Sequence, residues 1–250
     1  GDPLHVDVPG NTLLSPAYAT LRRALISDTA SLEMRPGHPD GRTPNIEANM
    51  NADSDLGDIG HYFSLGEPTV QASGEVRGDT VHIDIIDRHG NMVSATPSGG
   101  WLQSAPVIPE LGFCLNTRGQ MFWLDENSQS ALAPGRRPRT TLSPSLALRD
   151  GRPYLAFGTP GGDQQDQWQT LLFLNHVEHG MNLQQAIDHP AFHSEHFPVS
   201  FWPRINRPAR LVMEGRYPSA TIDELTKRGH DVVVGDDWSE GRLSAASKDG

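Results

Sequence analysis

The chain has 250 residues, of which 36% are hydrophobic and 20% are charged, and its formal net charge at pH 7 is -11. This length allows one large or two small globular domains, and the acidic balance with scattered Lys and Arg argues against a nucleic-acid partner. No apolar run is long enough to cross a bilayer, so we expect no membrane partner. The sequence does not distinguish a cytoplasmic from a periplasmic location.

The first predicted elements are a helix and a long linker. Ser15 and Pro16 form a helix start signal, and Ala17, Leu21 and Leu25 follow with helical spacing. Residues 35–78 are rich in Pro, Gly, Asn and Asp and have no sustained period, which is typical of an extended linker. A loop of that length usually has a function, and we interpret this one as leading to a processing site.

Strands are predicted from residue 80 onward, and helices after them. Alternating β-branched residues flank a turn at 88–91, and a second hairpin is predicted around Asp150 and Gly151. Such an order of strands and then helices indicates a layered α+β fold. The later predicted elements are a helix between Gly162 and Gly180, a helix from the Asn182 cap to Pro190, and a helix followed by a strand over 219–234.

Thr80 begins the first strand directly after the linker, in the sequence Gly78-Asp79-Thr80. A threonine hydroxyl is a poor nucleophile near neutral pH, but a free α-amine on the same residue, with a reference pKa of roughly 7.7–8.0, can serve as its base. Only cleavage between Asp79 and Thr80 creates that amine. Taken alone, Thr80 is better explained as a threonine that starts a strand, so the surrounding sequence must decide.

Several segments in a fixed order resemble the gamma-glutamyltransferase family of N-terminal-nucleophile hydrolases, and the resemblance runs from about Gly78 to His196. Residues 80–94, TVHIDIIDRHGNMVS, resemble the opening of that family's small subunit. The other matching segments are LGFCLN at 111–116, PGRRPRTTLSP at 134–144, DGRPYLAFGTPGG at 150–162, GMN at 180–182 and PAFH at 190–193.

The resemblance implies the family's αββα sandwich, of which this chain supplies a fragment. Residues 1–79 correspond to the C-terminal end of the large subunit plus the linker. Residues 80–250 correspond to the small, catalytic subunit without its last segment. The expected partners are therefore the remainder of the large subunit and a small-molecule amide substrate, and no cofactor or metal is implied.

Catalytic roles follow from the same resemblance. Thr80 is expected to attack the Asp79 carbonyl to cut its own chain, and then the acyl carbonyl of a substrate. Ser98 stands where the family has a second hydroxyl residue that hydrogen-bonds the nucleophile. Gly161 and Gly162 resemble the family's oxyanion donors, since glycine lets two backbone N–H groups approach the developing charge. The alternative for Gly161-Gly162 is a plain loop before a helix.

The expected substrate-binding positions depart from the family in part. Thr140 and Thr141 replace two serines that hold the substrate's α-carboxylate, and a pair of strand threonines is the alternative. Asn116 ends the LGFCLN segment, which resembles a substrate-side segment of the family, but Gly100 replaces an asparagine, and an arginine, Arg118, appears in the segment where the family's aspartate for the substrate's ammonium is missing. A guanidinium favours a neutral or anionic group, so we expect an acyl donor without a free α-amine, such as a glutaryl amide. The alternative for Arg118 is an exposed turn residue.

The function implied is amide hydrolysis or acyl transfer through a threonyl ester, with the uncleaved chain inactive. The alternative is a catalytically inactive relative that acts as a ligand-binding or interaction protein. A metal site is a further hypothesis, although no Cys partner or His-Glu-x-x-His signature accompanies the histidines. Those histidines are His176, His179, His189, His193 and His196.

Overall fold

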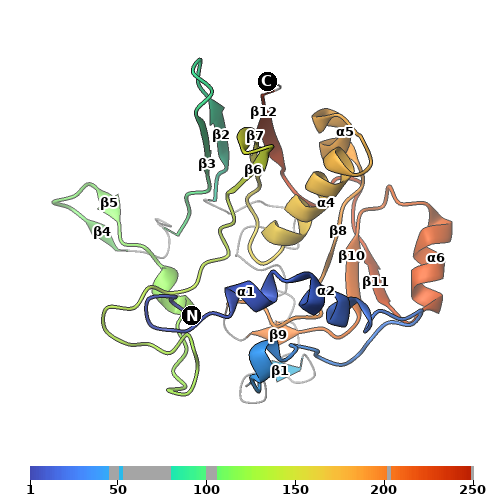
Figure 1. Ribbon diagram of the computed structural model, residues 1–250, viewed down its shortest axis with the longest axis horizontal. Helices are drawn as coiled ribbons and strands as arrows, with labels where there is room; N and C mark the ends of the chain where they lie inside the picture. Colours follow the sequence, from blue (N-terminus) through green and yellow to red (C-terminus); the bar gives the residue numbers. More distant parts are fainter. Residues whose placement is uncertain (45–50, 53–79, 100–105, 202–203, 249–250) are drawn as a thin grey trace.

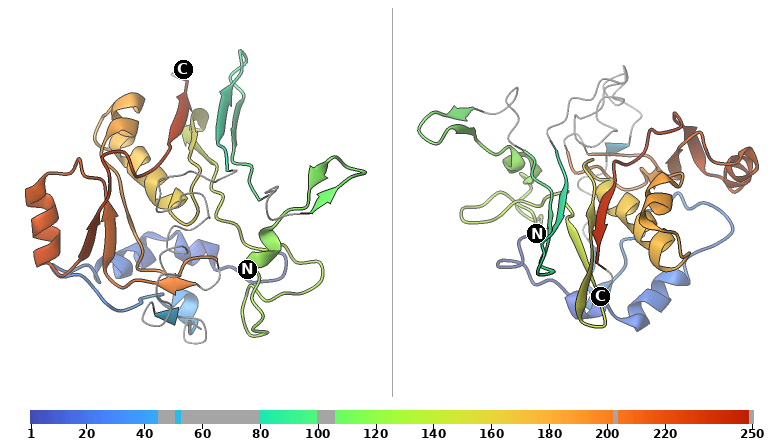
Figure 2. Two further views of the ribbon diagram at one scale, coloured as in Figure 1. Left: turned by 180° about the vertical axis from the view of Figure 1, so that it is seen from behind. Right: turned by 90° about the horizontal axis from the view of Figure 1, so that it is seen from above.

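The computed structural model describes residues 1–44, 51–52, 80–99, 106–201 and 204–248, so Asp79, Gly100 and most of the predicted linker lie outside the described residues. The centre of the molecule is a stack of three layers, visible from above in Figure 2. A hairpin packs on a three-stranded sheet, and two helices cover the other face of that sheet. The elements are β2 (Ile83–Ile86) and β3 (Met92–Ala95), β6 (Ser145–Arg149), β7 (Arg152–Gly158) and β12 (Ser244–Ser247), and α4 (Gln165–Val177) and α5 (Leu183–Asp188).

Both central hairpins turn where the sequence predicts. In the first, the carboxylate of Asp87 accepts from the backbone N–H groups of His89 (2.8 Å) and Asn91 (2.9 Å), which fixes the turn between β2 and β3. In the second, Asp150 and Gly151 have φ angles of 52° and 75°, the left-handed pair that a tight antiparallel hairpin requires. The strand order of the larger sheet is β12-β7-β6, with both pairings antiparallel.

The principal core lies between β7 and the two helices. Tyr154, Leu155 and Phe157 of β7 pack with Leu172 of α4 and Ala186 of α5 in one buried cluster. Burial of apolar surface at about 25 cal/mol per Å² makes such a cluster the main source of stability for this layer. The larger sheet is therefore stabilised mainly by the helices on one face, while the β2–β3 hairpin packs on its other face.

A second, smaller sheet lies beyond the helices, as Figure 1 shows. Its order is β11-β10-β8, and the β10–β11 pairing is parallel. The remaining bounds are β8 (Phe192–Ser194), β10 (Arg210–Met213), α6 (Ser219–Lys227), β11 (Asp231–Val234), α1 (Gly10–Leu13), α2 (Pro16–Arg23), the 3₁₀ turns at Pro39–Gly41 and Arg118–Met121, β1 (Asn51–Ala52), β9 (Ile205–Asn206), β4 (Val107–Ile108) and β5 (Phe113–Cys114).

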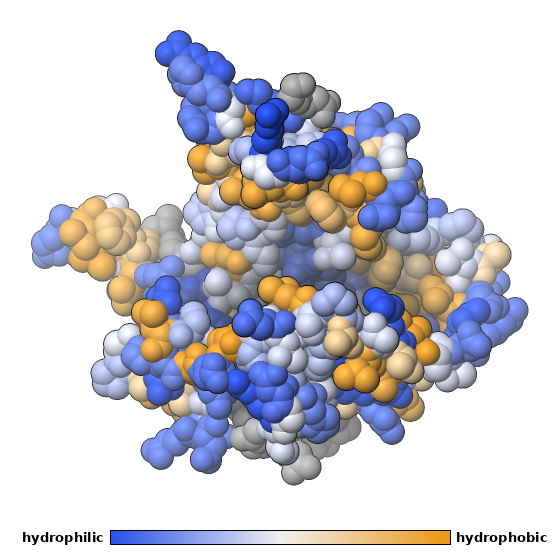
Figure 3. Space-filling view, viewed as in Figure 1, coloured by the Kyte–Doolittle hydropathy of each residue, from blue (hydrophilic) through white to orange (hydrophobic). Residues whose placement is uncertain are grey.

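Apolar side chains are exposed on two projecting parts of the molecule. The hairpin β2–β3 turns Ile83 (45% exposed) and Ile85 (53%) away from the sheet. The β4–β5 hairpin forms the projection on the left of Figure 3, and its Phe113 is 58% exposed. Exposed apolar surfaces of this kind are typical of sites that contact another chain.

The sequence predictions of secondary structure are largely confirmed. Ser15 caps α2 by accepting from Tyr18 N (3.2 Å), and α4, α5, α6 and β11 lie in the predicted regions. The short strands β1, β4, β5 and β9 were not predicted, nor were β8, β10 and β12, because none has an alternating pattern of useful length. In the part of the chain that the structure describes, no helix is long and apolar enough to span a bilayer.

The cap of α5 gives a first stability test. The Asn182 side chain accepts from Gln185 N (2.9 Å), and the Gln185 side chain accepts from Asn182 N (3.0 Å). We expect Asn182→Ala to lower the free energy of unfolding by about 1 kcal/mol in urea titrations, because the backbone N–H of Gln185 loses its acceptor. Asn182→Asp, which keeps an acceptor oxygen, should lose much less, and equal losses in both variants would contradict the capping role.

Candidate active site

The predicted nucleophile and its predicted partner are in contact. Thr80 lies three residues before the start of β2, and its Oγ1 is 2.6 Å from Oγ of Ser98, which lies three residues after the end of β3. The backbone pairing of Val81 N with Pro97 O (3.2 Å) extends the hairpin to this point. Thr80 is 9% exposed, so its hydroxyl is held in a defined, mostly buried position. The arrangement suits a hydroxyl nucleophile with a hydrogen-bond partner.

Arg118 and Asn116 lie beside the residue that follows Ser98. A Cβ placed on Gly99 would be 3.1 Å from Nε of Arg118 and 3.2 Å from Nδ2 of Asn116. Thr117 also fixes the position of Gly99, because its N–H (2.6 Å) and its hydroxyl (3.0 Å) both donate to Gly99 O. Arg118 is only 6% exposed, so the alternative of an exposed turn residue is wrong.

The predicted oxyanion loop runs from the end of β7 to the start of α4. Gly161 has a φ of 115°, which residues with a Cβ rarely adopt. The indole ring of Trp168 lies under it, since a Cβ on Gly161 would be 2.6 Å from Cζ3 of that ring. Gln165 N donates to Gly162 O (3.4 Å) as the helix begins. The loop is therefore shaped by packing as well as by glycine.

Thr140 and Thr141 precede β6 and are not strand residues, so the alternative of a strand pair is wrong. Thr140 is exposed, whereas Thr141 is 7% exposed, and its buried hydroxyl has no hydrogen-bond partner among the described residues. A buried hydroxyl without a partner is costly, and a ligand oxygen at this point would satisfy it. Thr141 is the better candidate of the two for a substrate contact.

Two contacts hold the segment of Thr140 and Thr141 against the predicted oxyanion loop. Ser143 N donates to Oε1 of Gln165 (3.2 Å). Arg139, next to Thr140, lies 3.9 Å from the carboxylate of Asp163, next to Gly162. The structure thus groups the predicted residues in two sets. Thr80, Ser98, Asn116 and Arg118 lie around Gly99, while Thr140, Thr141, Gly161 and Gly162 lie on two loops that are tied together.

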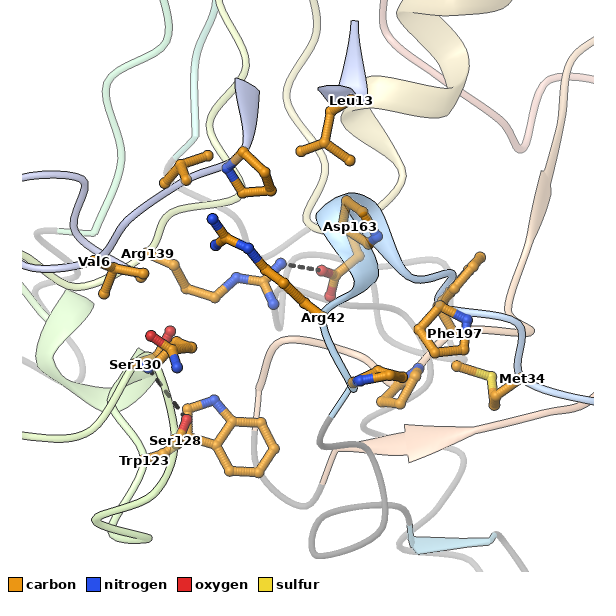
Figure 4. Close-up of a pocket in the computed structure, with 18 of the residues that line it drawn as sticks. Val6, Leu13, Met34, Arg42, Trp123, Ser128, Ser130, Arg139, Asp163 and Phe197 are labelled. Atoms are coloured by element: carbon orange, nitrogen blue, oxygen red, sulfur yellow. Dashed lines mark hydrogen bonds and ion pairs between the residues drawn. The ribbon is translucent and has the colours of Figure 1, made fainter. Parts of the chain in front are cut away.

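A cavity of about 1150 Å³ adjoins the second set. Figure 4 shows Arg42 pointing into it, with Arg139 against Asp163 on one wall and Trp123 and Phe197 on others. Thr80 is not among the described residues that line this cavity. We therefore locate the candidate active site by the Thr80 contacts and not by the cavity.

Burial and charge fix the side chain beneath the oxyanion loop. Trp168 donates Nε1–H to Glu240 (3.0 Å), and the same carboxylate accepts from Nδ1 of His193, which is 3% exposed. Burial opposes the charge on His193, but the hydrogen bond to Glu240 and the nearby carboxylate of Glu195 outweigh this and raise the pKa of His193 to about 9. The Trp168 ring is therefore anchored by a charged, buried pair.

The roles of Trp168 and His193 in supporting the loop at Gly161 were not predicted from the sequence. The only signal available was the apolar period of the helix that contains Trp168. The histidines of the metal hypothesis instead make separate contacts, such as His176 with Tyr154 Oη and with Met181 O (2.7 Å). Within the described residues, no group of three or more His, Cys, Asp or Glu side chains is arranged to hold a metal ion.

Comparison with known proteins decides the family. A model of the gamma-glutamyltranspeptidase family matches residues 1–250. The chain belongs to this family. The resemblance found in the sequence is therefore confirmed, and among the curated relatives of this family member are both glutathione hydrolase and acylase proenzymes.

Individual relatives of the chain are named for different substrates. The chain is 36% identical over 168 residues to the glutathione hydrolase-like YwrD proenzyme of Bacillus subtilis, covering 66% of the chain and 30% of that protein. It is 37% identical over 169 residues to the oxamate amidohydrolase proenzyme of Klebsiella pneumoniae, covering 67% of the chain and 31% of that protein. The chain thus spans about a third of the length of these curated relatives.

Solved structures agree with the fold. A variant of LmbA2991 matches with a TM-score of 0.83 and 53% identity, over 100% of this chain and 41% of that one. The cephalosporin acylase of Bacillus halodurans matches with a TM-score of 0.69 and 27% identity, over 99% of this chain and 37% of that one. The mixed helix and sheet architecture of the chain is thus shared with LmbA2991 and with the cephalosporin acylase.

The raised pKa of His193 predicts a loss of stability at alkaline pH. The imidazolium stabilises the folded state fully below about 6.5, its ordinary pKa, and this contribution is lost as the pH rises through about 9. We expect the free energy of unfolding to fall over this range by at most about 1.4 kcal/mol per pH unit from this group. Denaturant unfolding of wild type and of His193→Asn at several pH values measures this contribution.

The comparison separates His193 from other groups that titrate in the same range, because only its contribution differs between the two proteins. Parallel pH profiles for wild type and His193→Asn would contradict the prediction. Titration of the histidine ring signals by NMR is an independent check. One ring should titrate near pH 9, well above an ordinary histidine, and its signal should be absent in His193→Asn.

Proposed function

We propose that the complete protein is a threonine N-terminal-nucleophile amidohydrolase or acyltransferase that cleaves itself before Thr80 and then acts through a Thr80 ester. The observation that carries the proposal is the 2.6 Å contact between the hydroxyl groups of Thr80 and Ser98. By the resemblance in sequence, Thr80 stands at the position where the family has its nucleophile. A ligand-binding protein has no need for a partly buried hydroxyl pair of this kind.

Self-cleavage follows ordinary acyl chemistry. The Thr80 hydroxyl attacks the carbonyl carbon of Asp79, its proton passes to the departing Thr80 nitrogen, and the peptide bond becomes an ester. Water then hydrolyses the ester, which returns the hydroxyl and leaves a new carboxylate on Asp79. The product carries a free α-amine on Thr80, with a reference pKa of roughly 7.7–8.0. That amine is the base that the mature enzyme requires.

Turnover repeats the same bond changes on a substrate. The α-amine of Thr80 takes the hydroxyl proton as Oγ1 attacks the amide carbonyl, and the proton is passed to the leaving amine. Gly161 and Gly162 are proposed to donate their N–H groups to the oxyanion, and such a donor contributes on the order of 3 kcal/mol to the transition state. Water or an acceptor amine then attacks the Thr80 ester and frees the acyl group.

The proposed acyl donor carries a carboxylate but no α-amine. Arg118 lies against Gly99, one residue from the partner of the nucleophile, and its guanidinium repels an ammonium but pairs with a carboxylate. Thr141 offers a buried hydroxyl without a partner among the described residues. One relative is named for oxamate, an amide that bears a carboxylate and no ammonium. A glutaryl or shorter dicarboxylic amide fits these groups.

The proposed protein partner is the remainder of the family's large subunit. The outer face of the β2–β3 hairpin exposes Val81, Ile83, Ile85 and Val93, each at least 45% exposed. A helical layer on this face would bury them and complete the αββα sandwich that we propose for the whole protein. The chain spans 41% of the LmbA2991 chain, which leaves enough polypeptide in a protein of that size to form such a layer.

Intact mass and N-terminal sequencing of the complete gene product test the proposal. After incubation, wild type should yield a new chain that begins at Thr80, because the hydroxyl attacks the preceding carbonyl. Thr80→Ala should remain uncut, and Thr80→Ser, which keeps a hydroxyl, should be cut at the same bond. A wild-type chain that stays intact would favour an inactive, ligand-binding relative.

Matched amides test the role of Arg118. Glutaramate is L-glutamine without the α-amine, so ammonia release from the two compounds isolates the effect of the ammonium. We expect the mature enzyme to prefer glutaramate, and Arg118→Ala to lower its kcat/KM for glutaramate by roughly 10- to 100-fold, which is the range for a lost charged hydrogen bond. Oxamate should show whether a shorter donor is accepted.

Two controls sharpen this measurement. Arg152→Ala removes an exposed arginine at the opposite end of β7 from Gly158 and should leave the preference unchanged. Arg118→Lys keeps the charge but loses the planar fork, so it should retain part of the preference. If Arg118→Ala discriminates between glutaramate and L-glutamine as wild type does, the proposed donor is wrong, while self-cleavage is unaffected by that result.

A further inference from the structure

Polar side chains form a ladder on the face of the β2–β3 hairpin that packs on the larger sheet. The register pairs Asp84 with Ser94, and the hydrogen bonds of the extended hairpin continue it in steps of two residues. Because side chains alternate between the faces of a strand, all rungs point to the same side. The rungs are Asp84 with Ser94, His82 with Thr96, and Thr80 with Ser98.

His82 is the middle rung, and both of its ring nitrogens are held. Its side chain is 1% exposed, with Nε2 2.9 Å from the carboxylate of Asp84 and Nδ1 2.6 Å from Thr96 Oγ1. A carboxylate only accepts, so Nε2 carries a hydrogen, and in the neutral ring Nδ1 accepts from Thr96. The other carboxylate oxygen of Asp84 accepts from Ser244 on β12 (2.7 Å). The ring is thus anchored to the hairpin and to the larger sheet.

The backbone of β7 lies directly on this ring. A Cβ placed on Gly158 would be 2.1 Å from Cε1 of His82 and 2.5 Å from Nε2. Gly158 does not have a positive φ, so space alone requires a glycine here. Three residues later the chain reaches Gly161. The imidazole therefore separates the strand that carries Thr80 from the backbone that leads to the glycine loop.

We propose that His82 is a positioning residue that sets the distance between the Thr80 hydroxyl and the Gly161-Gly162 loop. The inference rests on the proposed function, because only a reaction that uses both groups depends on their separation. A histidine that merely filled the core would affect stability and leave the chemistry of the folded protein unchanged. A misplacement of about 1 Å, in contrast, can cost roughly 100-fold in rate.

A double-mutant cycle of His82 and Gly158 tests the proposal in the complete protein. Gly158→Ala should slow self-cleavage by roughly 100-fold, because its methyl group pushes the ring and the loop apart. His82→Ala should also slow cleavage. The double variant should cleave no more slowly than His82→Ala alone, because the methyl group then occupies the space of the missing ring. Gly10→Ala, at a glycine with nothing within 4 Å of an added Cβ, is the control.

Turnover of the mature enzyme supplies a second measurement. The variants should lose kcat with little change in KM, since the displaced groups act on the transition state and do not bind the ground state. Rates are compared well below the melting temperature of each variant. Thr96→Val, which removes only the hydroxyl at Nδ1, is a milder variant that should fold and should lower kcat by roughly 10-fold, the value of one hydrogen bond.

The outcomes separate the two proposals. If wild type cleaves itself but His82→Ala and Thr96→Val cleave and turn over within twofold of wild type, His82 has no positioning role. The same holds if the double variant loses the product of the two single losses, because the residues are then uncoupled. A wild-type protein that never cleaves overturns the proposed function, and this inference with it.

Discussion

The structure depends on a polar contact between two β layers. The hairpin that carries Thr80 packs on β7 and β12 through hydrogen-bonded side chains, whereas most stacked sheets meet through apolar ones. Buried polar groups must be paired, and here Ser94 donates to Phe157 O (3.1 Å) and Asp84 accepts from Ser244. Directional bonds fix one relative position of the layers, while apolar packing tolerates sliding. The hairpin therefore has a defined register on the sheet.

That register explains why the apolar face of the hairpin points outward. Alternation along a strand leaves no choice: if His82 and Asp84 face the sheet, then Val81, Ile83 and Ile85 face away from it. In an isolated domain this pattern would be a defect. In a fold with a further layer it would supply the apolar contact for that layer, so β2 would be held by polar bonds on one side and by burial on the other. On the proposed function, assembly and catalysis would then depend on the same hairpin.

Much of this arrangement could be predicted from local sequence. Asp87, Asp150-Gly151 and the Ser15 and Asn182 caps each act within a few residues, so their patterns identify the turns and helix starts. Motif order indicated the family, which the comparisons confirm, while the roles of Thr80, Ser98, Gly161 and Gly162 stay predictions. The His82–Gly158 contact joins residues 76 positions apart and has no local pattern. β12 was missed for the same reason, since it is defined only by its pairing with β7.

The glycine loop shows how distant residues can maintain a site that motifs identify. Asp163 follows Gly162 directly, and a free carboxylate there would oppose an oxyanion. Burial raises the pKa of Asp163, and both oxygens are bound by Ser200, whose N–H donates over 2.8 Å, with Arg139 nearby. On the other side, Glu240 holds the Trp168 ring under Gly161. Ser200 and Glu240 lie after the last matching motif, so the C-terminal part of the chain braces the loop from two sides.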